Sequence, residues 1–92
     1  MKKKCVFAGT FDPPTLGHKD IVLKCLTLFD EVIVAILINP NKSPLFSEEA
    51  RLAMLRKVFS AYPKVRVLAY DGLTVDLLRR EGAQFYVRGI RN

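Results

Sequence analysis

Residues 5–18 read CVFAGTFDPPTLGH, and this stretch decides the fold. The apolar run over residues 4–8 is bounded by Gly9 and is typical of a buried strand. Thr15 is a plausible N-cap for a helix that opens directly after it. A helix N-terminus offers unpaired N–H groups and the positive end of its dipole, and Gly9 has no Cβ to obstruct a ligand. The strand-to-helix junction therefore predicts a phosphate site.

Two side chains in this stretch could assist chemistry on a phosphate. Thr10 follows the strand directly, and His18 lies in the first turn of the expected helix. Both can donate hydrogen bonds beside the backbone amides, which suits a reaction in which negative charge builds up on phosphate oxygens. Thr10 could instead cap a turn, and His18 could be satisfied by a local carbonyl. The position of His18 at a strand-to-helix junction favours the phosphate role.

Length, charge and cysteine content exclude several classes of protein. The chain has 92 residues, which bounds it to one small domain over residues 1–92. Its net charge is +6, but the basic residues are scattered, with no basic helix or aromatic platform for nucleic acid. Two cysteines and one histidine offer neither a zinc site nor a disulfide framework. The apolar run near the N-terminus is too short for a signal peptide or a membrane span, so we expect a cytoplasmic protein without membrane contact.

Expected strands and helices alternate along the whole chain. Strands are expected over residues 4–8, 32–38, 65–68 and 85–87. A first helix is expected after Thr15, with Ile21, Val22, Cys25, Leu26 and Phe29 on its buried face. A second is expected from Ser47, with Leu52, Leu55, Val58 and Phe59 on its buried face and Pro63 preventing its extension. A third is expected over residues 72–81 and ends at Gly82. This order predicts an α/β fold with a doubly wound, Rossmann-like parallel sheet of strand order 3-2-1-4. The first two helices would cover one face of that sheet and the third helix the other.

Polar residues follow each of the four expected strands. Thr10 follows the first, residues 39–42 the second, residues 70–74 the third and residues 88–91 the fourth. Ligands of such sheets bind beyond the carboxyl ends of the strands, where the strand order reverses. We therefore expect these segments to converge on one crevice that binds an anionic ligand.

Four segments together carry a family resemblance. Gly-Thr-Phe-Asp-Pro with Thr-x-Gly-His over residues 9–18 resembles the nucleotidyltransferase superfamily. Combined with Asn-Pro-Asn-Lys-Ser-Pro-Leu-Phe at 39–46, Glu-Glu-x-Arg at 48–51 and Arg-Gly-Ile-Arg at 88–91, it is similar to the phosphopantetheine adenylyltransferase family of bacterial coenzyme A synthesis. Cytidylyltransferases and nicotinamide mononucleotide adenylyltransferases would share the first motif but not the last. The resemblance implies transfer of AMP from ATP to 4′-phosphopantetheine, which gives dephospho-coenzyme A and pyrophosphate.

The resemblance also implies roles for individual residues, all within residues 10–91. It implies that His18 and Thr10 are catalytic, that ATP is bound by Thr10, Phe11, His18, Gly89, Ile90 and Arg91, and that the acceptor is bound by Thr10, Lys42, Thr74 and Arg88. No protein ligands for a metal are implied, and Mg²⁺ would arrive with ATP. The family assembles as homohexamers, so a homo-oligomer is expected.

Several alternatives stay open at this point. Lys42, Arg88 and Arg91 could be solvated surface cations, and Thr74 could bond only to its own helix. Glu48, Glu49 and Arg51 are most simply interpreted as helix-end electrostatics. The chain could also serve another phosphorylated acceptor, or be an inert fragment that binds phosphate or nucleotide.

The resemblance also predicts a longer chain. Members of the family continue with an acidic helical segment and a serine-rich triphosphate motif that this sequence lacks. The expected sheet leaves one edge open beside its fourth strand. We therefore expect a nucleotidyltransferase domain over residues 1–92 that is truncated at its C-terminal side.

Overall fold

The computed structural model describes residues 3–38 and 43–88, with Arg88 described only as the last residue of a strand. The predicted site residues Lys42, Gly89, Ile90 and Arg91 lie outside the described residues. Seven elements alternate along the chain: β1 (Lys4–Gly9), α1 (Leu16–Leu26), β2 (Glu31–Leu37), α2 (Glu48–Val58), β3 (Val65–Tyr70), α3 (Thr74–Glu81) and β4 (Phe85–Arg88).

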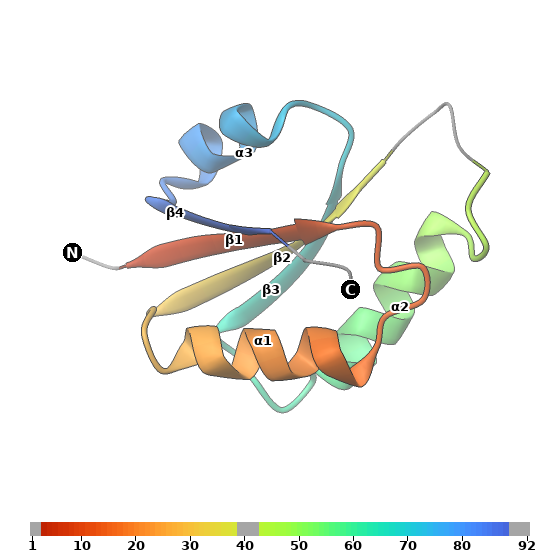
Figure 1. Cartoon of the computed structure of the whole chain (residues 1–92), viewed down its shortest axis with the longest axis horizontal. Helices are drawn as coiled ribbons and strands as arrows, with labels where there is room; N and C mark the ends of the chain where they lie inside the picture. Colours follow the sequence, from red (N-terminus) through yellow and green to blue (C-terminus); the bar gives the residue numbers. More distant parts are fainter. Residues whose placement is uncertain (1–2, 39–42, 89–92) are drawn as a thin grey trace.

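The four strands form one parallel sheet in the order β3-β2-β1-β4 (Figure 1). In its register, Cys5 of β1 lies opposite Val32 of β2 and Phe85 of β4. The predicted doubly wound sheet and its strand order are confirmed. All four strands therefore end at the same edge, and β1 lies at the point where the order reverses.

The helices divide between the two faces of the sheet as predicted. Figure 1 shows α1 and α2 on one face and α3 on the other. Residues 32–36 of β2 are fully buried, because helices cover both faces of that central strand. The larger core lies on the α1 and α2 side and includes Cys5, Phe7, Phe11, Val22, Cys25, Val32, Val34, Ile36, Leu55 and Phe59; the smaller one contains Val6, Ala8, Ile33, Ala35 and Leu77.

Local chemistry sets the ends of the helices. Thr15 and Ser47 cap α1 and α2 through their hydroxyl oxygens, which accept the amides of His18 and Ala50. Gly82 ends α3 in a left-handed conformation with φ 66°, which glycine adopts without steric cost. The predicted caps at Thr15, Ser47 and Gly82 are confirmed.

One predicted helical residue, one predicted core position and one predicted helix start are wrong, although Phe29 still packs against the core. α1 ends at Leu26, so Phe29 lies beyond the helix and its ring packs on Phe85, with centroids 5.0 Å apart. The Thr27 hydroxyl donates to the carbonyl of Lys24 and turns the chain there. α2 ends at Val58, well before Pro63, and Val58 is 37 % exposed. α3 begins at Thr74 because Leu73, its N-cap residue, has an extended backbone conformation.

The strand β4 is less covered than the central strands. Its residues Phe85 and Tyr86 are 48 % and 41 % exposed. β4 pairs only with β1 among the described residues, and neither Phe85 nor Tyr86 is among the residues of the two cores. Of the described helices, none is long and apolar enough to cross a membrane.

Candidate active site

His18 is held at the first turn of α1 by a reciprocal pair of hydrogen bonds. Its Nδ1 accepts the backbone N–H of Thr15 at 2.9 Å, while its own N–H donates to the Thr15 hydroxyl oxygen at 3.3 Å. This is a capping box in which histidine takes the place usually held by Glu or Gln. Because Nδ1 acts as an acceptor, the proton of the neutral ring is assigned to Nε2. The structure thus leaves Nε2–H as the donor that a ligand could use.

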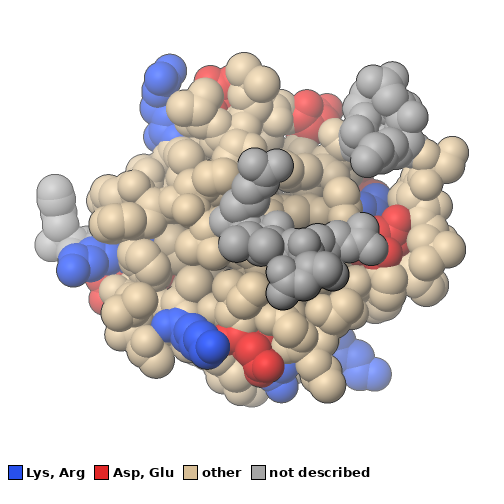
Figure 2. All heavy atoms as spheres, in the orientation of Figure 1, with Lys and Arg blue, Asp and Glu red and all other residues tan. Residues whose placement is uncertain are grey.

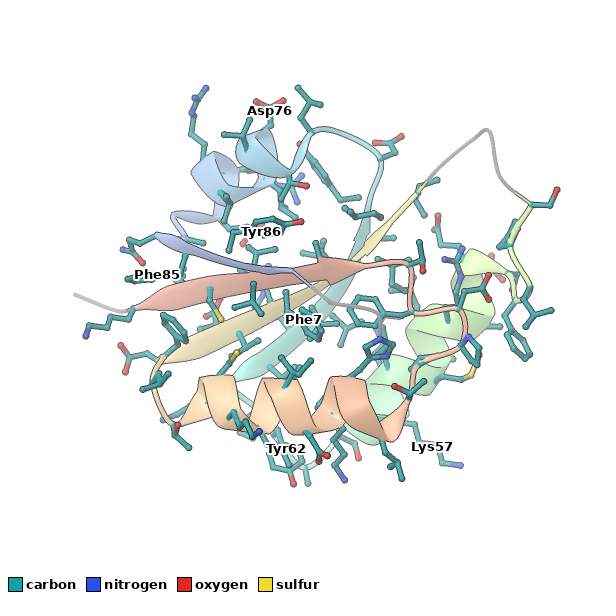
Figure 3. All side chains as sticks on the ribbon, viewed as in Figure 1. Phe7, Lys57, Tyr62, Asp76, Phe85 and Tyr86 are labelled. Atoms are coloured by element: carbon teal, nitrogen blue, oxygen red, sulfur yellow. The ribbon has the colours of Figure 1, made fainter. Side chains whose placement is uncertain are left out.

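The surroundings of the ring favour this neutral form. The His18 ring packs edge-on against Phe11, with centroids 4.7 Å apart, and lies 6.1 Å from Phe7. Phe7 is fully buried between β1 and α1 (Figure 3). Partial burial lowers the pKa of His18 below its ordinary value of 6.5. At neutral pH the imidazole is therefore a neutral donor in a fixed orientation.

The N-terminus of α1 also leaves backbone donors free. No described residue accepts the N–H of Leu16 or of Gly17, while the N–H groups of His18 and Lys19 both donate to the Thr15 carbonyl at 3.1 and 3.3 Å. Unpaired amides and the positive end of the helix dipole favour an anion at this point. The capping hydrogen bonds between Thr15 and His18 leave the N–H groups of Leu16 and Gly17 available for the predicted phosphate site.

Phe11 lies beside His18, and Thr10 directly precedes Phe11 at the end of β1. Thr10 follows β1 and is exposed. Phe11 is buried, has a positive φ of 48°, and packs its ring edge-on against Phe7 at 5.2 Å. A Cβ at Gly9 would meet the Phe11 ring at 3.5 Å, an ordinary contact. The structure therefore brings Thr10, Phe11 and His18 together at the end of β1.

Sequence reasoning missed two residues that hold this loop in place. The Asp12 carboxylate accepts the backbone N–H groups of Leu45 and Phe46, the latter at 2.7 Å. The Arg51 guanidinium donates to the carbonyl of Thr10 at 2.9 Å. Arg51 is 5 % exposed, so the interpretation as helix-end electrostatics was wrong. A readable signal was its position four residues before Leu55, on the apolar face of the helix.

Thr74 stands apart from this group. It is the half-buried first residue of α3, on the other face of the sheet, and no described residue is hydrogen bonded to its hydroxyl. Near the ends of β2 and β3 there is an open hollow of about 350 Å³, and Thr74 is not among its described lining residues. The Arg80 guanidinium lies 5.0 Å from the centre of the Tyr70 ring; both side chains line the hollow, together with Ile38, Glu48, Ala69 and Asp71.

Paired charges gather at the opposite edge of the sheet. Arg66 contacts the carboxylates of Glu31 and Glu81 at 3.3 and 2.6 Å, and Lys4 lies 3.9 Å from Glu31. Hydrogen bonds from Arg66 lower the pKa of Glu81. Elsewhere, Figure 2 shows basic side chains in separate places on the face in view. The neutralised charges thus lie at the amino edge of the sheet, away from His18.

The chain is similar to a family of known proteins and to individual members with assigned names. Residues 6–92 match the family model described as cytidylyltransferase-like. The chain is 47 % identical over 90 residues to a phosphopantetheine adenylyltransferase of Flavobacterium psychrophilum and 52 % identical over 93 residues to one of Porphyromonas gingivalis. These alignments cover 98 % and 100 % of this chain. The chain spans only 60 % and 61 % of the length of those two relatives.

Solved structures support the same fold. The NadR protein in complex with NAD and AMP-PNP matches with a TM-score of 0.65 and 27 % identity, covering 77 % of this chain and 21 % of that one. A nicotinic acid mononucleotide adenylyltransferase of Plasmodium falciparum matches with a TM-score of 0.70 and 22 % identity, covering 98 % and 52 %. The second likeness shows the fold alone.

Proposed function

The chain belongs to the cytidylyltransferase-like family, and from this premise we propose that its protein transfers AMP from ATP to 4′-phosphopantetheine. The products are dephospho-coenzyme A and pyrophosphate. The observation that carries the proposal is the neutral His18 at the N-terminus of α1, whose Nε2–H is hydrogen bonded to no described residue. The relatives named phosphopantetheine adenylyltransferase support the choice of acceptor.

The proposed reaction is a direct in-line displacement. An oxygen of the acceptor's phosphate attacks the α-phosphorus of ATP and forms the new P–O bond. The bond from the α-phosphorus to the α,β-bridging oxygen breaks, and its electron pair leaves with pyrophosphate. The nucleophile is already an anion, so no general base is needed, and the protein's task is to position and to stabilise charge.

His18 supplies a preorganised donor for this step. Its Nε2–H would donate to an α-phosphate oxygen as charge grows there, and the amides of Leu16 and Gly17 would add to the same field. The ring needs no proton transfer because it donates as a neutral group. Its anchoring by Thr15 at 2.9 Å limits the reorganisation needed during the reaction.

The remaining roles follow the resemblance. Thr10 would orient the attacking phosphate and Phe11 would contact ATP through its backbone. Lys42 and Arg88 would hold the phosphate of the acceptor, with Thr74 beside its remaining part. Arg91 and the backbone of residues 89–90 would hold ATP.

Mg²⁺ fits this proposal as a partner of the nucleotide. Within residues 3–38 and 43–88 no three His, Cys, Asp or Glu side chains gather into a site for a metal ion. We propose that the cation is carried by the ATP phosphates, where it would screen the charge of the leaving group. We propose further that the protein acts in the cytoplasm as a homohexamer, which would cover exposed apolar side chains such as Leu45 and Phe85.

The test uses the natural protein that contains this sequence. It is incubated with ATP and a panel of acceptors (4′-phosphopantetheine, pantetheine, nicotinamide mononucleotide and glycerol 3-phosphate), with pyrophosphate release as the readout. The proposal expects release with phosphopantetheine alone. Release with another phosphorylated acceptor would reassign the substrate, and nucleotide binding without release for any acceptor would assign a binding role. A parallel run with CTP establishes which nucleotide is used, and light scattering gives the number of subunits.

A further inference from the structure

Arg51 is unusual among the charged residues of this protein. Among the side chains described over residues 3–38 and 43–87 it is the only charged one that is buried, at 5 % exposed. No described carboxylate forms an ion pair with it. Burying a charge without a counter-ion costs free energy that an apolar side chain of similar length would not. Packing of α2 alone therefore gives no reason for an arginine here.

The donors of Arg51 show where that cost is offset. Nη1 donates to the Thr10 carbonyl at 2.9 Å, and Nε donates to the Ser47 carbonyl at 3.3 Å. The Ser47 carbonyl already accepts the Arg51 backbone N–H at 3.0 Å within the helix. The bond to Thr10 is therefore the one that joins separate parts of the chain. It is a charge-assisted bond and stronger than one between neutral groups.

This bond fixes the orientation of the peptide between Thr10 and Phe11. In a trans peptide the carbonyl and the N–H point in opposite directions. With the Thr10 carbonyl turned toward Arg51, the Phe11 N–H is turned away from it, and no described residue accepts that N–H. The ring of Phe11, packed against Phe7 and His18, holds the other side of the same peptide. The backbone donor next to His18 is thus held from two directions.

We propose that Arg51 is a positioning residue for adenylyl transfer. Its guanidinium sets the Thr10–Phe11 peptide so that the Phe11 N–H and the Thr10 hydroxyl meet the phosphates in the geometry that the reaction requires. Arg51 acts through this peptide and does not touch the substrate. The inference rests on the proposed function. It adds a residue of α2, Arg51, to the residues that follow β1 and contact the phosphates.

The kinetic test compares Arg51→Met with the matched control Arg56→Met in the full natural protein. Arg56 lies on the same helix and is exposed. Methionine keeps an unbranched apolar stem, shorter than that of arginine, and removes every donor, so we expect Arg51→Met to fold cooperatively while kcat falls at least about tenfold. The KM for ATP should change less than about threefold, because the lost geometry matters in the transition state. Arg56→Met should retain wild-type kcat.

Two further measurements cover the other outcomes. If Arg51→Met does not fold, Arg51→Lys, which keeps the charge and one compact donor group, should fold and show a smaller fall in kcat at unchanged KM. The amide resonance of Phe11, followed by NMR, should shift on addition of ATP in the wild type and lose that shift in the variant. A folded Arg51→Met or Arg51→Lys protein with wild-type kcat would overturn the inference.

The amide readout separates this inference from the proposed function. If the wild type binds ATP with an Arg51-dependent shift of Phe11 but transfers no adenylyl group, the proposed function fails and the positioning role stands. If the wild type is active and the variant is equally active, the proposed function stands and the positioning role is wrong.

Discussion

Replacing His18 should separate helix capping from catalysis. The imidazole does two things: Nδ1 accepts the Thr15 N–H at 2.9 Å, and Nε2–H is free to stabilise the transition state. His18→Ala removes both. Loss of the cap partner should cost about 0.5–1 kcal/mol of unfolding free energy. Loss of one preorganised donor should raise the activation barrier by about 2.7–4 kcal/mol, a fall in kcat of about 10²–10³-fold.

His18→Gln is the matched variant. Glutamine is a usual partner in a capping box, and its side-chain oxygen can accept the Thr15 N–H as Nδ1 does. We expect an unfolding free energy within about 0.5 kcal/mol of the wild type. We expect kcat to fall nearly as much as in His18→Ala, because turning the amide oxygen back to the Thr15 N–H also turns the amide nitrogen away from the position of Nε2. Denaturant melts give the first quantity and initial rates of pyrophosphate release give the second. Wild-type kcat in a folded His18→Gln or His18→Ala protein would refute the catalytic role.

Three more outcomes are expected. In NMR, the imidazole of His18 should carry its proton on Nε2 and titrate with a midpoint below 6.5. Stability should therefore fall as pH drops through 6.5 toward that midpoint, and a midpoint above 6.5 would contradict the assigned cap. Lys42→Ala and Arg88→Ala should weaken binding of phosphopantetheine far more than that of pantetheine in calorimetry, whereas equal losses would remove them from the phosphate site. Arg66→Gln should raise the pKa of Glu81, which Arg66 now lowers. The Glu81 carboxylate contributes stability above pH 4.5 and loses it at lower pH, and this contribution should become smaller in the variant. Acid melts identical to the wild type would show that the pair contributes nothing.

The fold could be predicted because its local signals agree with one another. Continuous apolar runs mark strands that are covered on both faces, and the alternation of strands with helices leaves few parallel arrangements. Thr15, Ser47 and Gly82 act through contacts within a few residues, which a sequence displays directly. These signals were sufficient to predict the order β3-β2-β1-β4 and the division of the helices between the faces.

The errors arose where tertiary packing decides. Phe29 has helical spacing with Cys25, but the chain turns at Thr27 and the Phe29 ring packs on β4 instead. Val58 has the spacing of the core stripe and yet faces solvent, because Phe59 fills the core at the end of α2. The spacing of apolar residues predicts which side of a helix faces the core, but it does not predict the residue at which the helix ends.

The site was predicted in its ligand-facing part and missed in its supporting part. Thr10, Phe11 and His18 lie close in sequence, and the N-terminus of a helix that follows a strand is a common binding site for phosphate. Arg51 contacts Thr10 across 41 positions, and Asp12 reaches Leu45 and Phe46 across 33 and 34. Such contacts depend on how α2 packs against the end of β1, and residue type alone does not reveal that arrangement.

The stereochemistry at the α-phosphorus tests the central claim most directly. The natural protein is given 4′-phosphopantetheine and ATP made chiral at the α-phosphorus by sulfur substitution, and the configuration of the resulting dephospho-coenzyme A thiophosphate is determined. Direct in-line attack by the acceptor's phosphate, with His18 as a donor and no covalent intermediate, predicts inversion. Retention would require two displacements through an adenylylated enzyme and would contradict the mechanism, and no labelled product at all would contradict the proposed transfer itself.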